Sequence, residues 1–283
     1  MDKRLNEETV LTTSGNVSYL KFDALEKIPF IRHGFSTKLG GVSGGVFASM
    51  NLGFDRGDDN ENVMENYRRI AKAIGFDTHD LVFLDQWHTT NIRVAQPKDR
   101  GKGIYLEKDY ESVDGHITDE EDIVLLAFGA DCPSIFLVDT ESRAIGLCHS
   151  GWKGTLARIA QKTLNAMKNQ YGTRPENIVA LVGPSICGDC YEVEENVATP
   201  FSEEFKCEIA SFPRIVMPGK SKGKFQLDLW EANRAILKSA GVLTENIHVS
   251  GVCTMENPDL LFSHRRDGSA RGSMAAFLMI RGD

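Results

Sequence analysis

The chain has 283 residues, of which 41% are hydrophobic and 25% are charged, and its formal net charge is -8. These proportions are ordinary for a globular protein and exclude a disordered or fibrous one. Charges of both signs are scattered without a basic stripe, so we do not expect nucleic acid as a partner. No apolar run approaches the roughly 20 residues of a membrane-spanning helix. The polar start MDKRLNEETV is unlike a signal peptide, so we expect a cytoplasmic protein.

The first third of the chain alternates short strands with loops and one helix. We expect residues 1–16 to form a flexible N-terminal extension, followed by strands over 17–22 and 31–37. The glycine-rich loop 39–45 can bring backbone N–H groups to an anion, although a flexible turn explains it equally well. Apolar residues at helical spacing between Asn60 and Gly75 predict an amphipathic helix.

The middle of the chain contains the densest strand pattern. We expect strands over 81–88 and 91–95, and a surface crossing over 97–116. Segments 122–130, 134–139 and 144–150 are apolar at nearly every position, which predicts strands buried on both faces. Further expected elements are helices over 155–172, after Tyr191 and over 227–241, and strands over 178–186, 247–254 and 273–280.

Strands and helices do not alternate strictly in this order, as they would in a doubly wound α/β fold. The pattern therefore predicts an α+β fold, a single-domain layered sandwich in which helices flank a mixed β-sheet. Residues 1–283 contain no internal repeat and no linker, so we expect one domain.

One cysteine and two histidines follow the ends of expected strands. Cys132 stands in GADCPS, His149 ends AIGLCH before a helix, and His88 ends LDQWH. Two imidazoles and one thiolate suit Zn²⁺ and leave its fourth position free for water or substrate. The positions are too far apart in sequence for a local zinc signature. Buried packing residues, or a nucleophilic pair of Cys132 and His149, are the alternatives.

Other polar residues are candidates for the same site. Asp114 and Asp131 are carboxylates close in sequence to the expected ligands, so they are candidates for proton transfer. The adjacent guanidiniums of Arg265 and Arg266 in SHRRDG can bind a phosphate together, with a surface ion-pair cluster as the equally good alternative. The candidate phosphate-binding residues are Lys38, Gly44 and Arg265.

The remaining cysteines and histidines have weaker patterns. Cys187 and Cys190 form a lone CxxC pair, for which we favour a structural role or chance proximity. Cys148 alternates to the face opposite His149 and is expected in the core. If residues 114–116 are extended, Asp114 and His116 lie on one face and can share a site. We expect solvated or structurally satisfied side chains at His33, His79, His116 and His248.

Taken together, the motifs resemble those of the YfiH/YlmD family, formerly described as multicopper polyphenol oxidases with a laccase domain. DQWHTT, DGHIT, GADCPSIFLVD, CHSGWKGT, VGPSICGDCYEV and FSHRRDG occur in that order, and the resemblance runs from about residue 31 to the end. It implies a single-domain α+β sandwich with one zinc ion on His88, Cys132 and His149. It also implies phosphorolysis of adenosine, inosine, guanosine and methylthioadenosine, and deamination of adenosine at the same site.

Some residues depart from the family's usual pattern, and three other functions are considered. Lys38 and Lys153 stand where relatives often carry arginine, and the order ARG around Arg271 leaves the role of that residue open. The alternatives are a metal-free hydrolase, a copper-dependent polyphenol oxidase and a non-catalytic nucleoside-binding module. Seven histidines are few for a site with several copper ions.

Overall fold

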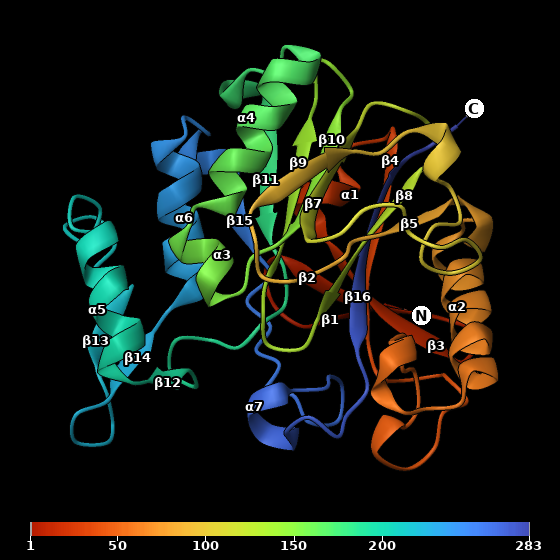
Figure 1. Ribbon diagram of the computed structural model, residues 1–283, viewed down its shortest axis with the longest axis horizontal. Coiled ribbons are helices and arrows are strands. Elements are labelled where there is room, and N and C mark those ends of the chain that lie inside the picture. The colour runs from red at the N-terminus through yellow and green to blue at the C-terminus, as the bar shows by residue number, and fades with distance from the viewer. Residues whose placement is uncertain (1, 283) are drawn as a thin grey trace.

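The computed structural model describes residues 2–282 as two large β-sheets packed face to face, with helices on the outer face of each (Figure 1). This arrangement confirms the predicted α+β layered sandwich, with two mixed sheets where one was expected. One core fills the space between the sheets. A second and a third core each lie between one of the sheets and the helices that cover it. No helix within residues 2–282 is both long and apolar enough to cross a bilayer.

The first sheet has seven strands, which are antiparallel except for the parallel pair β5 and β8. Helix α2 (Asn60–Ile74) covers its outer face and ends at Gly75 as predicted, while α1 (Asp23–Glu26) connects β3 and β4. In spatial order the strands are β1 (Asp2–Arg4), β2 (Thr9–Ser14), β3 (Val17–Phe22), β4 (Ile31–Ser36), β16 (Met274–Ile280), β8 (Val124–Gly129) and β5 (Leu81–Phe83).

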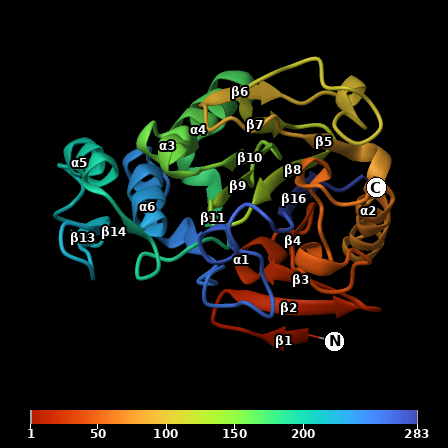
Figure 2. The ribbon, with the colours of Figure 1, turned by 60° about the horizontal axis from the view of Figure 1, so that its bottom comes forward.

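The N-terminal segment belongs to this sheet. Strand β1 pairs with β2, and β2 pairs with β3 over six residues, so both lie at one edge of the sheet (Figure 2). The expectation of a flexible extension over residues 1–16 is therefore wrong for residues 2–14, and Met1 lies outside the described residues. The ladder hydrogen bonds of β2 explain the difference, because they order a polar segment that buries little apolar surface.

The second sheet has six strands and carries three helices on its outer face. Helices α3 (Trp152–Leu156), α4 (Ile159–Tyr171) and α6 (Leu229–Ser239) pack on this face. In spatial order the strands are β15 (Ile247–Val249), β11 (Ile178–Val182), β9 (Ser134–Asp139), β10 (Ile145–His149), β7 (Val113–Thr118) and β6 (Asn91–Val94).

A smaller unit projects from one side of the sandwich (Figure 1). It contains helix α5 (Glu195–Glu204) and a three-stranded sheet. The short helix α7 (His264–Asp267) is a separate element that precedes the last strand, β16. The strands of the small sheet are β12 (Glu192–Val193), β14 (Phe225–Leu227) and β13 (Val216–Pro218).

The central strands confirm the most apolar part of the sequence pattern, whereas three boundaries differ. Strands β9 and β10 are buried at every position, as predicted. Residues 113–116 belong to the buried strand β7 rather than to a surface crossing, and the expected strand 81–88 ends at Phe83. The expected helix over 155–172 is broken at Arg158, which has a φ of 58° and ion pairs with Glu204 and Glu208.

Candidate functional site

Three side chains from two loops and one strand end converge in the structure. One ligating atom each from His88, Cys132 and His149 lies within 4.8 Å of the other two. Strand β10 ends at His149, which pairs with the residue at the start of β9, just after Cys132. The imidazole rings of His88 and His149 lie edge to face with centroids 4.8 Å apart. The structure thus brings together all three expected ligands.

The backbone at Gly151 allows this convergence. A Cβ atom at this position would lie 2.9 Å from the sulfur of Cys132 and 2.9 Å from Cδ2 of His88. Such contacts are closer than real Cβ atoms make, so the cluster leaves room only for glycine. No local sequence pattern indicates this requirement, because the closeness depends on how two distant loops meet the turn after β10.

Asp114 supports the cluster from behind. Its buried carboxylate accepts a hydrogen bond from Nδ1 of His149 at 2.9 Å. It also accepts the backbone N–H groups of Trp87, His88 and Thr89 at 3.0, 3.1 and 2.8 Å. Burial opposes the charge of this carboxylate, but the bonds from His149 and Thr89 lower its pKa. One carboxylate therefore orients one ligand and fixes the loop that carries another.

The protein environment favours the ionised forms of the partly buried Cys132 and the buried His149. Burial alone would raise the pKa of Cys132, but the hydrogen bonds and charges of His149 and His88 lower it to about 6. Burial disfavours the charged form of His149, but Asp114 and Cys132 together raise its pKa to about 9. A thiolate is the form of cysteine that binds a metal or attacks a substrate, so both chemistries are favoured.

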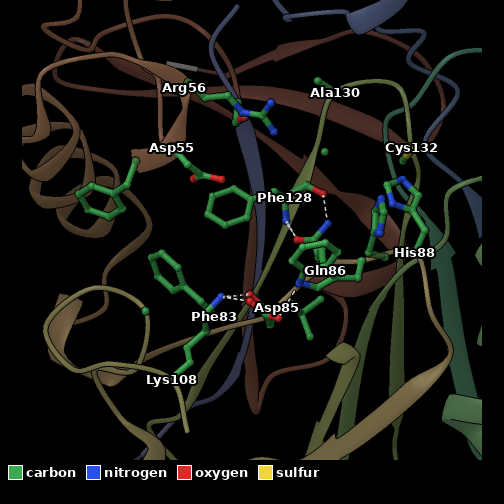
Figure 3. A pocket seen from close by; sticks show the side chains of 18 of the residues that line it. Asp55, Arg56, Phe83, Asp85, Gln86, His88, Lys108, Phe128, Ala130 and Cys132 are labelled. Carbon is green, nitrogen blue, oxygen red and sulfur yellow. Dashed lines mark hydrogen bonds and ion pairs between the residues drawn. The ribbon is translucent and has the colours of Figure 1, made fainter. Parts of the chain in front are cut away.

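Two cavities meet at the cluster. The first has a volume of about 380 Å³ and the second about 400 Å³, which is the size range of small-molecule sites. Figure 3 shows the first cavity, with His88 and Cys132 on one wall and the side chains of Gln86 and Phe128 beside them. The residues shared by both cavities are Arg56, His88, Ala130, Cys132 and Arg271.

Two arginines lie at this junction without a carboxylate partner. Arg271 is only 7% exposed and donates to the carbonyl of Gly272, while its Nε finds no acceptor among residues 2–282. Burial and then the charge of Arg56 lower the pKa of Arg271. Arg56 donates from Nε to the hydroxyl of Ser273 at 3.0 Å. In the described part of the chain neither arginine forms an ion pair, so the junction is suited to an anion.

Arg56 is not among the residues expected at the site, and the sequence leaves the role of Arg271 open. Arg271 stands just before β16, whose first residue pairs with Gly129 at the end of β8. The chain reaches Cys132 three residues after that glycine. Only the pairing of these strands places the arginine near the cysteine, and no local motif contains that information.

Asp131 and Arg265 line the second cavity. The carboxylate of Asp131 accepts the hydroxyl of Thr254 at 2.5 Å and the backbone N–H of Arg265 at 2.6 Å. The guanidinium of Arg265 donates to the carbonyl of Glu192 and lies 4.9 Å from the ring centroid of Tyr191. Both expected residues thus line the same cavity as His88 and Cys132.

The structure does not bring the glycine-rich loop to the cluster. Neither Lys38 nor Gly44 lines either cavity. The backbone carbonyl of Lys38 accepts hydrogen bonds from the N–H and the hydroxyl of Ser49. Gly44 is exposed. The expectation that these two residues bind phosphate at this site is therefore corrected, because the loop packs beside α2 through Asn66.

Known proteins resemble this chain over nearly its whole length. A family model described as multi-copper polyphenol oxidoreductase laccase matches residues 32–281. The purine nucleoside phosphorylase of Deinococcus radiodurans is 40% identical over 248 residues, which cover 88% of each chain. Adenosine deaminase RL5 from an unknown prokaryotic organism is 36% identical over 88% of this chain and 95% of that protein. The crystal structure of Bacillus licheniformis hypothetical protein YfiH matches with a TM-score of 0.85 at 29% identity, covering 99% of both chains.

Proposed function

The chain belongs to the family described as multi-copper polyphenol oxidoreductase laccase, and we propose that it is a zinc-dependent purine nucleoside phosphorylase that also deaminates adenosine. The proposed substrates are adenosine, inosine, guanosine and methylthioadenosine with phosphate, and the proposed location is the cytoplasm. The observation that carries the proposal is the junction where a His₂Cys cluster meets the buried, unpaired guanidinium of Arg271. A metal and an anion would act there side by side.

The donor set fits one zinc ion better than several copper ions. His88, Cys132 and His149 supply three ligands, and zinc sites with three protein ligands keep a position open for catalysis. Within residues 2–282 this is the one metal-like cluster that contains histidine, which argues against a multicopper centre. When bound, the ion supplies a Lewis acid beside the reacting atoms.

Phosphorolysis requires phosphate next to C1′ of the nucleoside. A phosphate oxygen forms the new bond to C1′ while the bond from C1′ to the base nitrogen breaks, and the base leaves with the electron pair and takes a proton. We propose that Arg271 and Arg56 hold the phosphate, because guanidiniums bind its oxygens through paired N–H groups. The fixed charge of the phosphate then stabilises the positive charge that develops on the sugar.

The two expected proton carriers receive different roles. Asp131 lines the second cavity, so we propose that it exchanges a proton with the base. Asp114 is buried behind His149 and lines neither cavity, so we propose a positioning role for it instead of direct proton transfer.

A metal-free hydrolase is the second candidate, because Asp114, His149 and Cys132 form a hydrogen-bonded chain of the kind that activates a nucleophile. The position of His88 argues against it. Its imidazole hydrogen-bonds the same sulfur and would crowd a substrate that approaches the thiolate. In a hydrolase, His88→Ala should leave a folded protein whose Cys132 is still alkylated rapidly. In the zinc enzyme, the same variant should lose this zinc and both activities.

Incubation of the zinc-loaded protein with inosine and phosphate tests the proposal. We expect hypoxanthine and ribose 1-phosphate in equal amounts, and neither product when phosphate is omitted. Adenosine without phosphate should yield inosine and ammonia. Free ribose in place of ribose 1-phosphate would indicate hydrolysis. Absence of any product from zinc-loaded protein that still binds inosine would favour the non-catalytic binding module.

A further inference from the structure

Four side chains that can bind a metal gather away from the histidines. One ligating atom each from Cys187, Cys190, Cys253 and Glu256 lies within 4.8 Å of the other three. Cys187 and Cys253 are buried, Cys190 is partly buried and Glu256 is exposed. The second cluster shares no residue with the first.

Backbone pairing between two distant segments creates this cluster. The N–H of Ser185 donates to the carbonyl of Val252, and the N–H of Thr254 donates to the carbonyl of Ser185. This short parallel bridge places the C-x-x-C turn at 187–190 beside a C-x-x-E turn at 253–256. The N–H of Cys190 donates to the carbonyl of Cys187, which folds the first turn so that its two sulfurs face the second. Structural zinc sites usually consist of two facing turns with two Cys or His ligands each, and here Glu256 occupies one of these four positions.

The surroundings of the Cys253 sulfur are those of a bound thiolate. The backbone N–H of Cys187 donates to this sulfur at 3.4 Å, and the amides of Met255 and Glu256 also point towards it. Backbone N–H groups around a sulfur stabilise negative charge on it. In tetrahedral zinc sites Zn–S bonds of about 2.3 Å place the sulfurs roughly 3.8 Å apart, which the spacing of the cluster accommodates.

We propose that Cys187, Cys190, Cys253 and Glu256 bind a second zinc ion in a closed, structural site. Three thiolates and one carboxylate complete a tetrahedron, so no position is left for substrate. A disulfide would use only two sulfurs and would give no role to the third sulfur or to the carboxylate. Three sulfur ligands also favour zinc over magnesium or calcium, which bind oxygen.

The second site would stabilise the wall of the second cavity. Thr254, next to Cys253, donates to the carboxylate of Asp131. Arg266 donates to the carbonyls of Thr254 and Met255 at 3.0 and 3.1 Å. A zinc ion on the turn 253–256 would therefore hold fixed the segment that supports Asp131, directly beside Cys132. This role does not depend on which reaction the first cluster performs.

Metal content of the purified protein tests the proposal. We expect two zinc ions per chain in the wild type, one in Cys253→Ser, one in His88→Ala and none in the double variant, measured by mass spectrometry of the metal. Cys207→Ser is the matched control, because Cys207 is an exposed cysteine outside both clusters, and it should retain two. A wild type with one zinc ion that Cys253→Ser keeps would overturn the proposal. So would an intact mass showing a disulfide within the cluster of freshly purified protein.

A second measurement covers the case in which the cysteine variant fails to fold. Glu256 is exposed, so Glu256→Gln should fold normally and yet lose one of its two zinc ions to a chelator at least tenfold faster. Loading with Co²⁺ adds a spectroscopic signature, because each thiolate ligand contributes charge-transfer absorption. Three of the four expected thiolates belong to the second cluster, so His88→Ala should keep most of this absorption. Its complete loss in His88→Ala would contradict a second site, whether or not the protein has phosphorolytic activity.

Discussion

The carboxylate of Asp114, in strand β7, accepts a hydrogen bond from Nδ1 of His149 at 2.9 Å. This contact orients the side chain of His149, the last residue of the neighbouring strand β10. The same carboxylate accepts the backbone N–H of His88. Two proposed zinc ligands from separate parts of the chain therefore depend on one buried group. Such support normally matters for metal sites, because it fixes the tautomer and the orientation of the ring.

We predict that Asp114→Asn weakens zinc binding at the first cluster by about 10- to 100-fold. The amide keeps the size of the carboxylate, but it cannot accept from all the donors that Asp114 now satisfies. Competition with a chelator measures the affinity, and kcat should recover at high zinc concentration. Glu120→Gln removes an exposed carboxylate beyond the end of the same strand and should change neither quantity. Equal zinc affinity in both variants would disprove the positioning role.

We predict that Gly151→Ala lowers zinc affinity by about tenfold or more. The new methyl group would lie 2.9 Å from the sulfur of Cys132, so the sulfur or His88 has to move away. Gly44→Ala is the matched control, because a Cβ there meets no atom within 4 Å and the backbone φ of -107° suits alanine. The control should retain full zinc content and full activity. Normal zinc affinity in Gly151→Ala would show that the cluster is less crowded than its geometry indicates.

We predict that Arg271→Met raises KM for phosphate by roughly 10- to 100-fold and leaves KM for inosine nearly unchanged. Loss of a charge-assisted hydrogen bond costs about 1.5–3 kcal/mol, which corresponds to that range. The variant should be no less stable than the wild type, because it removes a buried guanidinium that lacks an ion-pair partner. Steady-state kinetics at varied phosphate and urea unfolding measure the two effects.

Arg265→Ala provides the comparison for this anion site. Its guanidinium already binds the carbonyl of Glu192 and the ring of Tyr191, so we expect a smaller rise in KM for phosphate than in Arg271→Met. Zinc content should stay at the wild-type level. A larger effect of Arg265→Ala on KM for phosphate would place the phosphate in the second cavity instead of at the junction. Loss of zinc in this variant would count against an anion-binding role for Arg265.

The sequence predicted which three side chains converge better than it predicted their surroundings, and the reason is physical. Apolar runs such as 134–139 and 144–150 identify buried strands with Cys132 and His149 next to their ends, which shows only that the two side chains can meet; the family resemblance supported His88 as the third side chain and added the expectation of a shared site. Arg56 and Arg271 come from loops that meet only because β16 inserts between β4 and β8. Strand order of this kind depends on long-range packing, which periodicity does not reveal.

The two cysteine turns illustrate the same limit. CGDC at 187–190 is a weak pattern on its own, and Cys253 carries no motif that connects it with Cys187. The parallel bridge between Ser185 and Cys253 makes them neighbours.

Similarly, Asp114 and His116 share a face of β7 as their alternation indicated, but only Asp114 reaches the site. His116 points instead into the core between the sheets, where it contacts the ring of Tyr110.

We expect two buried histidines to make the free energy of unfolding depend on pH. Burial lowers the pKa of His33 to about 3, and burial followed by the charge of Arg93 lowers that of His116 to about 3. Between pH 6.5 and 3 the unfolded chain binds a proton at each position that the folded chain excludes. The free energy of unfolding should therefore fall as the pH falls below 6.5. The upper limit is about 1.4 kcal/mol per pH unit for each histidine.

We predict that His116→Leu makes this dependence shallower without weakening the fold at pH 7.5. Neither ring nitrogen of His116 has a hydrogen-bond partner among residues 2–282, so leucine removes a buried polar group and leaves no donor unpaired.

His33 differs, because its Nε2 accepts the backbone N–H of Phe22 at 3.0 Å. His33→Leu should therefore unfold more easily at pH 7.5 while also losing pH dependence. Urea unfolding of both variants and the wild type at pH 7.5 and 5.5 measures the difference, and contributions from the metal clusters cancel in the comparison. If His116→Leu keeps the full loss of stability between these two pH values, His116 does not exclude a proton in the folded protein, and this explanation of the pH dependence is wrong.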